Sequence, residues 1–213
     1  YDIQNIPDCY YGEELGFMRQ VANSSFRYSE TIKTAYDSST AAVSYPTNNS
    51  LASSLAIIAR LIKGNLGTKV YMASIDGFDT HANQLTSHAT LLTRIGTAVK
   101  AFYDDLAATG HNQQVLIATH SEFGRRVFQN GSLGTDHGEA APIILIGDGL
   151  GGNGFVGTAP NIAQSNWVGP GNLPVEIDFR RLYATLLQDW FCMHPAIVDA
   201  VMGQSFTRLS GLV

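Results

Sequence analysis

The sequence has few cysteines, few charged residues and no long apolar run, and each shortage excludes a class of protein. Cys9 and Cys192 are the only cysteines among 213 residues, and their wide separation matches no metal-binding motif. No apolar stretch approaches the ~18–20 residues that a transmembrane helix needs. Charged residues make up 15% of the chain, its formal net charge is −5, and Lys and Arg form no run. We therefore expect neither a membrane-spanning segment nor a nucleic-acid partner.

The composition also bears on the compartment in which the protein works. Lys is scarce while Ser, Thr, Asn, Gly and Tyr are abundant, which favours an exported protein. The chain starts at Tyr1 without a signal-peptide pattern or an initiator Met, so we expect the numbering to begin inside a longer precursor. Two interpretations of the cysteines stay open. They are either two buried free thiols or one long-range disulfide, which would require an oxidising compartment.

Helical patterns occupy both ends of the chain and its middle. Residues 1–49 are predicted to form an N-terminal arm and a long helix from Glu13 to about Tyr36, although its apolar stripe is imperfect. Ser50 is a good N-cap for a second helix, which ends at Gly64. A third helix is predicted over about 86–109, because its apolar residues recur on one face. Further helices are expected after Asp178 and from Pro195.

Three apolar, β-branched runs predict buried strands, at residues 69–75, 114–119 and 142–147. The helix between the first two runs makes a strand–helix–strand unit, so these two strands should be parallel. Their nearly continuous apolar character implies burial on both faces. We therefore predict an α/β fold with a mostly parallel sheet sandwiched by helices.

Three strands are few for such a sheet, since doubly wound sheets usually have five or more. We therefore expect residues 1–213 to be a single α/β domain that is incomplete on its N-terminal side and forms the C-terminal part of a larger domain. An unpaired sheet edge promotes association. The expected partners are therefore the missing N-terminal segment of the same protein or further copies of the chain.

Polar clusters follow the predicted strands, and open α/β sheets bind ligands at the carboxyl ends of their strands. The three clusters are Asp79 with His81, Glu122 with Arg125 and Arg126, and Asp136 with His137. Asp and His are common ligands of divalent metals, and the fork of an Arg side chain matches two oxygens of a phosphate or sulfate. Structural interpretations remain open: Asp79 could cap the next helix or turn, and Glu122 could pair with an Arg to order its loop.

Taken together, the clusters predict a divalent metal site. We expect Asp79, His81, Asp136 and His137 to be metal ligands, with the two histidines as the nitrogen donors. Glu122 is the candidate general base, and Arg125 is expected either to hold an oxyanion or to pair with Glu122. Zinc is the expected metal, and manganese and calcium are the alternatives.

Beyond the single clusters, three motifs in their order resemble one family. They are Gly77-Phe78-Asp79-Thr80-His81, Ser121-Glu122-Phe123-Gly124-Arg125, and Asn130-Gly131-Ser132 followed by Gly134-Thr135-Asp136-His137-Gly138. Across residues 50–192 the chain resembles the bacterial exported proteins known as domain of unknown function 1501. That family is similar to the alkaline phosphatase and sulfatase superfamily, whose α/β sandwich holds metal at its strand ends. The resemblance implies a periplasmic or extracellular, metal-dependent hydrolase whose substrate is an anionic small-molecule or polymer ester of phosphate or sulfate.

The chain departs from the superfamily pattern at two points. In the segment that occupies the place of the sulfatases' Ser-Asp-His-Gly, Glu122 replaces the Asp and Phe123 replaces a ligating His. The superfamily's first motif, which supplies a metal-binding Asp and the nucleophile, has no counterpart in this chain. His137 resembles the superfamily's later His ligand. These departures favour an alternative function, a non-catalytic cell-surface or periplasmic protein of the same fold.

Overall fold

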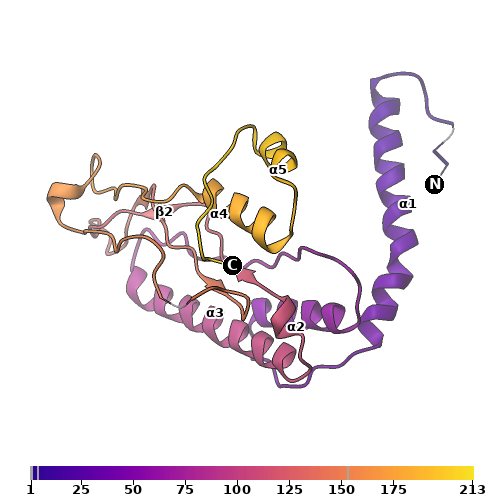
Figure 1. Cartoon of the computed structure of the whole chain (residues 1–213), viewed down its shortest axis with the longest axis horizontal. Coiled ribbons are helices and arrows are strands. Elements are labelled where there is room, and N and C mark those ends of the chain that lie inside the picture. The colour runs from indigo at the N-terminus through magenta and orange to yellow at the C-terminus, as the bar shows by residue number, and fades with distance from the viewer. Residues whose placement is uncertain (1, 4, 153) are drawn as a thin grey trace. The chain divides into compact units, whose positions relative to one another are not determined.

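The computed structural model describes residues 2–3, 5–152 and 154–213. It divides into two compact units (Figure 1): unit 1 comprises Tyr1–Ile75 and Thr93–His111, and unit 2 comprises Asp76–Leu92 and Asn112–Val213. Helices dominate, and the two sheets found in the described part of the chain have two strands each. No helix in the described ranges combines the length and the hydropathy needed to cross a membrane, as the sequence predicts.

Unit 1 is built from helices. They are α1 (Tyr10–Asp37), α2 (Ser50–Lys63) and the larger part of α3 (Gln84–Ala107). Asn49 caps α2 by accepting a hydrogen bond from the Ala52 N–H, so the N-cap lies one residue before the predicted Ser50. At the other end of α2, a side chain on Gly64 would collide with the Ala35 carbonyl, so glycine permits the close approach of α1 and α2. The core of the unit consists mainly of small and branched apolar residues: Ala35, Leu51, Ala52, Leu55, Ala59, Ala98, Ala101, Phe102 and Leu106.

A buried ion pair lies inside this helical core. Lys63 Nζ is 2.6 Å from Asp105 Oδ1, and the two side chains are 4% and 0% exposed. The Asp105 carboxylate also accepts hydrogen bonds from the Ala42 N–H at 2.7 Å and from the Tyr45 hydroxyl at 2.9 Å. Burial raises the pKa of Tyr45, and the neighbouring carboxylate raises it further. The Asp105 carboxylate of α3 therefore links α2 and the 40–45 loop to that helix.

Unit 2 contains both sheets and the C-terminal helices. Strand β1 (Ile117–Ala118) pairs antiparallel with β4 (Leu145–Ile146), and β2 (Gly124–Arg125) pairs antiparallel with β3 (His137–Gly138). α4 (Phe179–Thr185) begins at its Asp178 cap, as predicted, and continues as the π-helical segment η3 (Leu186–Trp190). The remaining elements are α5 (Pro195–Met202) and the 3₁₀ turns η1 (Asn112–Gln114) and η2 (Gln164–Asn166).

The predicted parallel sheet sandwiched by helices is wrong. The runs 114–119 and 142–147 contribute only β1 and β4, which pair with each other in the antiparallel sense. Residues 69–75 join neither sheet, and Val70 and Met72 are 71% and 89% exposed. The physical reason is that β-branched, apolar residues favour an extended chain without specifying a partner. A strand–helix–strand order therefore does not by itself create a parallel ladder.

The two cysteines are both free and exposed. Both interpretations of the cysteines are therefore wrong, since they are neither buried nor joined by a disulfide. Cys9 is the residue before α1, where its side chain makes no capping hydrogen bond. Cys192 follows η3 in a left-handed backbone conformation with φ of 54°.

Candidate metal centre

The candidate site lies within unit 2, where two loops are joined by backbone hydrogen bonds. The loop that carries Asp79 and His81 leads into α3, and its end is attached to the 130–134 turn through bonds from Asn83 N–H to Ser132 O and from Gln84 N–H to Leu133 O. Gly134 allows this contact, because a Cβ at this position would lie 2.2 Å from the His81 carbonyl carbon. The same turn leads directly into β3, which begins with His137.

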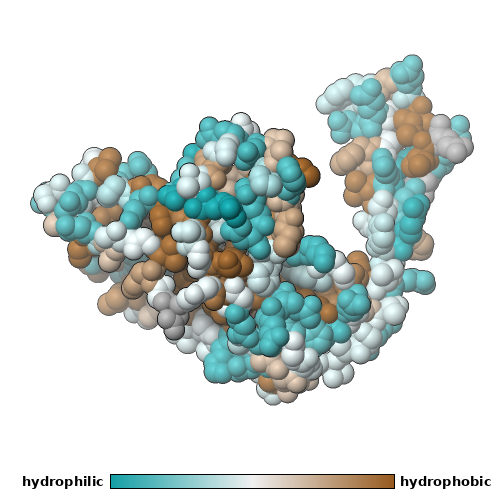
Figure 2. All heavy atoms as spheres, in the orientation of Figure 1, coloured by the Kyte–Doolittle hydropathy of each residue, from teal (hydrophilic) through white to brown (hydrophobic). Residues whose placement is uncertain are grey.

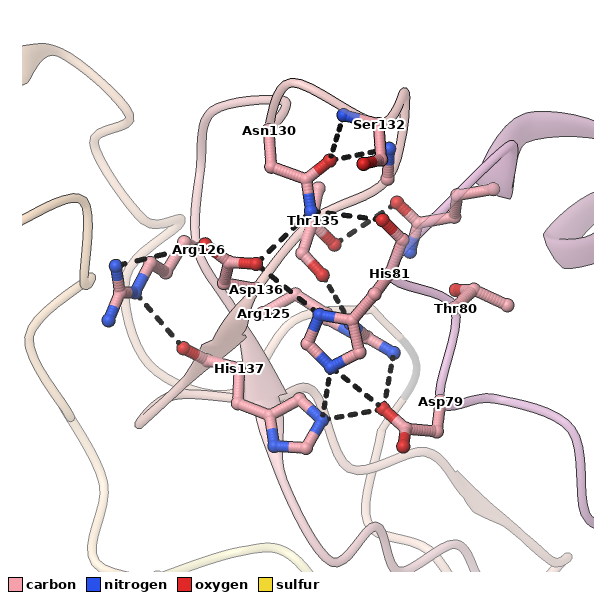
Figure 3. Close-up of polar contacts among 12 residues, drawn as sticks. Asp79, Thr80, His81, Arg125, Arg126, Asn130, Ser132, Thr135, Asp136 and His137 are labelled. Atoms are coloured by element: carbon pink, nitrogen blue, oxygen red, sulfur yellow. Dashed lines mark hydrogen bonds and ion pairs between the residues drawn. The ribbon is translucent and has the colours of Figure 1, made fainter.

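Three side chains present their donor atoms to one point (Figure 3). His81 Nε2 and His137 Nε2 are 3.2 Å apart, and Asp79 Oδ1 lies 3.1 Å from the first and 2.7 Å from the second. Tetrahedral zinc, with bonds of ~2.0–2.2 Å, separates neighbouring ligand atoms by roughly 3.3 Å. The three donors are therefore spaced as ligands of a single ion. Each side chain is about half exposed, so the point is open to solvent.

Asp136 lies behind His81 instead of joining the three donors. The His81 Nδ1–H donates to Asp136 Oδ1 at 3.3 Å, and Asn130 Nδ2 donates to the same oxygen at 3.1 Å. The Asn130 hydrogen bond, followed by that of His81, keeps the pKa of Asp136 below its usual value. A proton fixed on Nδ1 leaves Nε2 of His81 free to bind a metal. Asp136 was predicted to be a metal ligand, but in the structure it is the hydrogen-bond partner that orients His81.

The carboxylate of Asp79 is held in its ionised form by the histidines. A hydrogen bond from His137, together with the nearby charges of His137, His81 and Arg125, lowers the pKa of Asp79. Without a metal, one proton on His137 Nε2 satisfies the hydrogen bonding of all three donor atoms. It points at Asp79 Oδ1, and the unprotonated His81 Nε2 lies beside it as a second acceptor. A divalent ion at the same point would take the place of that one proton.

Arg125 connects the two loops of the site. Its guanidinium donates to the carbonyls of Phe78 and Thr135, and Nη2 lies 3.8 Å from Asp79 Oδ1. It does not pair with Glu122, which was one of its two predicted roles. Glu122 is exposed, and it makes no ion pair or side-chain hydrogen bond with any residue that the structure describes. The structure therefore brings together five of the six predicted site residues and leaves Glu122 outside.

Two residues of the site have roles that the motif analysis did not assign. Phe123 stacks on the His137 ring with centroids 3.8 Å apart and planes 9° apart. The guanidinium carbon of Arg125 lies over the Phe123 ring, 4.8 Å from its centroid. Asn130 donates to the His81 carbonyl and to Asp136, while its own oxygen accepts from the Ser132 and Gly134 N–H groups. The Asn-Gly-Ser turn signal could have identified Asn130. No sequence signal indicates the Phe123 stack.

Comparison with known proteins identifies a family. The sequence model of a family described as "protein of unknown function (DUF1501)" matches residues 12–202. A search of curated proteins found no match, and a search of solved structures found none either. The family match spans both units and includes every residue of the candidate metal centre. The chain belongs to the DUF1501 family of proteins of unknown function.

Proposed function

We propose that this protein is an exported, metal-dependent hydrolase of phosphate or sulfate esters, related to alkaline phosphatases and sulfatases. The observation that carries the proposal is the convergence of Asp79, His81 and His137. Because the sheet is not the sandwich of that superfamily, the proposal rests on the donor set and its surroundings. The Lys-poor, Ser- and Asn-rich composition supports a periplasmic or extracellular location in a bacterium.

The donor set favours zinc over the other divalent metals. Two imidazole nitrogens and one carboxylate oxygen form a catalytic zinc set that leaves a fourth position open. Manganese is compatible with this set, whereas calcium prefers six to eight oxygen ligands. Held by Asp79, His81 and His137, zinc would supply Lewis-acid chemistry: it would make a water more acidic and would polarise an ester oxygen.

The charges around the donors favour an anionic substrate. Asp79 supplies one negative charge to a divalent ion, and the two histidines bind it as neutral ligands. Asp136 is accompanied by Arg126, whose Nη1 is 4.0 Å from Asp136 Oδ2 and whose guanidinium points away from the donors in Figure 3. Arg125 then adds a positive charge 3.8 Å from Asp79. The loaded site therefore carries an excess of positive charge, which suits phosphate and sulfate esters.

The chain's own residues would each have a defined task. Asp79 and the two histidines hold the ion, and Asp136 keeps the Nδ1 proton on His81. Arg125 fixes Asp79 and the two loops by its backbone hydrogen bonds. Phe123 covers one face of His137, which limits rotation of that ring.

Hydrolysis of chromogenic esters tests the proposal. We expect the zinc-loaded protein to hydrolyse p-nitrophenyl phosphate or p-nitrophenyl sulfate, and to lose this activity on treatment with a chelator or on the change His137→Ala. His120→Ala, which removes an exposed histidine outside the cluster, is the matched control. Zinc binding without any metal-dependent turnover would contradict the hydrolase and favour the non-catalytic alternative, in which the ion has a structural role.

The change Asp136→Asn tests the orienting role of Asp136. We expect zinc affinity to fall about 10–100-fold, because loss of a carboxylate behind a ligating histidine typically has this effect. Competition with a chromogenic chelator measures the affinity. Glu139→Gln removes a nearby exposed carboxylate outside the cluster and should change it less than 2-fold, as a rough limit. Equal effects of the two changes would show that Asp136 acts only through general charge.

A further inference from the structure

Asn130 uses every hydrogen-bonding group of its side chain within the candidate metal centre (Figure 3). Its Nδ2 group donates to the His81 carbonyl at 3.0 Å and to Asp136 Oδ1 at 3.1 Å. Its Oδ1 accepts from the Ser132 N–H at 2.9 Å and from the Gly134 N–H at 3.0 Å. An asparagine amide offers two N–H donors and two acceptor sites, so all four are used. Turning the amide by 180° would set its oxygen against a carbonyl and a carboxylate, which fixes its orientation.

Burial does not force this arrangement, because the Asn130 side chain lies near the surface. Asn130 is only partly buried, and hydrophilic and hydrophobic residues are interspersed on the visible surface around β2 (Figure 2). Water could therefore satisfy a free amide at this position at little cost. Four protein partners in place of water indicate that the amide holds those partners in position.

The two bonds that Asn130 accepts hold the turn that joins the two loops of the centre. This turn contains Leu133 with φ of 62°, a left-handed conformation that a bulky side chain seldom adopts. Such a conformation persists only where the surrounding structure holds it. The Asn130 oxygen does so by binding the N–H groups on both sides of Leu133. The carbonyls of the same turn accept the backbone bonds that attach the metal-binding loop, so Asn130 secures that attachment.

The two bonds that Asn130 donates act on His81 from two directions. One N–H holds the His81 carbonyl, which fixes the backbone of this candidate ligand. The other holds Asp136 Oδ1, the same oxygen that accepts the His81 Nδ1–H at 3.3 Å. Removing the amide would free the Asp136 carboxylate to rotate away from the imidazole. Nδ1 and Nε2 of His81 would then compete for the proton that Asp136 now keeps on Nδ1.

We infer that Asn130 is a positioning residue of the metal centre. It fixes the backbone of His81 directly, and through Asp136 it selects the imidazole tautomer that leaves Nε2 open to a metal. Asn130 itself supplies none of the three donor atoms. This role rests on the metal centre of the proposed function, but it does not depend on which ester that centre hydrolyses.

Zinc affinity in a double-mutant cycle tests this role. Asn130→Ser keeps a hydroxyl acceptor for the turn but loses both donated bonds. We expect it to lower zinc affinity about 10-fold, the lower end of the range for a partner of a ligating histidine. In an Asp136→Asn background the same change should lower it only about 2–3-fold, because one of its two routes to His81 is already lost. Equal factors in the two backgrounds would show that Asn130 does not act through Asp136 and would overturn the inference.

A second asparagine provides the matched control for this cycle. Asn112 also belongs to unit 2, and its side chain donates to the carboxylate of Asp148, outside the metal centre. Asn112→Ser therefore removes the same kind of bond and should leave zinc affinity unchanged. An equal loss of affinity in Asn112→Ser and Asn130→Ser would show a general loss of stability in place of positioning.

The tautomer of His81 in the metal-free protein gives a readout that a change in stability alone would not move. Nitrogen-15 NMR distinguishes the protonated from the unprotonated ring nitrogen, and comparison with His81→Ala assigns the signals. At about pH 8, where an ordinary histidine is neutral, we expect the unmodified protein to carry the proton on Nδ1. Asn130→Ser should show a mixture of both tautomers. An unchanged tautomer in this variant would overturn the inference.

The same measurements remain decisive if the ester assay or the variant fails. A failed ester assay would remove the proposed function and leave the role of Asn130 standing, since neither measurement uses a substrate. If Asn130→Ser does not fold, amide exchange in the unmodified protein provides the test. The side-chain amide protons of Asn130 should exchange with solvent at least about 10-fold more slowly than those of the exposed Asn161. Equal exchange would show that the donated bonds are not held and would overturn the inference.

Discussion

Replacing His137 with alanine is expected to lower the affinity of the protein for zinc by at least about 100-fold. The physical reason is that His137 Nε2 lies within 3.2 Å of both other donor atoms, so its loss leaves two protein ligands. The loss of an orienting partner alone lowers affinity about 10–100-fold, and loss of a ligand should exceed that range. His81→Ala and Asp79→Ala are expected to act in the same way. Isothermal titration with zinc measures the effect on stoichiometry and affinity.

Other residues of the chain provide matched controls for this experiment. His120 is an exposed histidine outside the cluster, so His120→Ala should retain one zinc per chain with unchanged affinity. The change His81→Ala combined with His137→Ala should add little to either single change, since each already removes the site. Full zinc affinity in His137→Ala would show that the three donors are not a metal site, whatever the hydrolysis assays show.

The helices of this protein are easier to predict than its strands because their signals are local. The apolar period and the end signals predicted at Ser50 and Gly64 place α2 to within a residue, since capping hydrogen bonds involve only neighbouring residues. Strand formation depends on a distant partner. The run 69–75 has the composition of a strand, yet the described residues offer it no ladder, and Met72 points into solvent.

The motifs predicted which residues of the site meet, although the predicted reason was wrong. Parallel strand ends were expected to bring Asp79, His81 and His137 together. In the structure, the Asn83–Ser132 and Gln84–Leu133 backbone bonds do so. Asp136 differs from the three donors in the direction in which its carboxylate points, towards His81 Nδ1. The spacing of residues in the sequence cannot predict such a direction. The same holds for Glu122. Its position next to Phe123 in the sequence did not indicate that its side chain would lie outside the cluster.

Removing the buried carboxylate of Asp105 is expected to destabilise unit 1 strongly. Asp105→Ala leaves Lys63 as a buried, unpaired charge, and breaking a buried ion pair in this way typically costs about 3–5 kcal/mol. The Ala42 N–H and the Tyr45 hydroxyl lose their acceptor as well. Asp104→Asn is a matched control, because the neighbouring Asp104 forms an exposed pair with Lys100. An exposed pair contributes about 1 kcal/mol at most.

Urea denaturation measured with two probes can assign the loss to unit 1. Both tryptophans, Trp167 and Trp190, belong to unit 2, so their fluorescence reports on that unit. Circular dichroism at the helical band follows unit 1 more closely, since α1, α2 and most of α3 lie there. We expect Asp105→Ala to shift the dichroism transition far more than the fluorescence transition. Replacing both partners, with Lys63→Met and Asp105→Leu, should recover much of the loss, because no charge is then left unpaired.

The pH dependence of unit 1 gives an independent test of the same carboxylate. Burial alone would raise the pKa of Asp105, but the hydrogen bonds from Lys63, Ala42 and Tyr45 outweigh it and lower this pKa below its usual value. A carboxyl group with a lowered folded pKa stabilises the protein fully above its unfolded pKa, about 3.9. This stabilisation is lost as the pH falls from there through the folded pKa. The unmodified protein should therefore lose stability below about pH 4 more steeply than Asp105→Asn, and equal slopes would show that Asp105 is not ionised in the folded state.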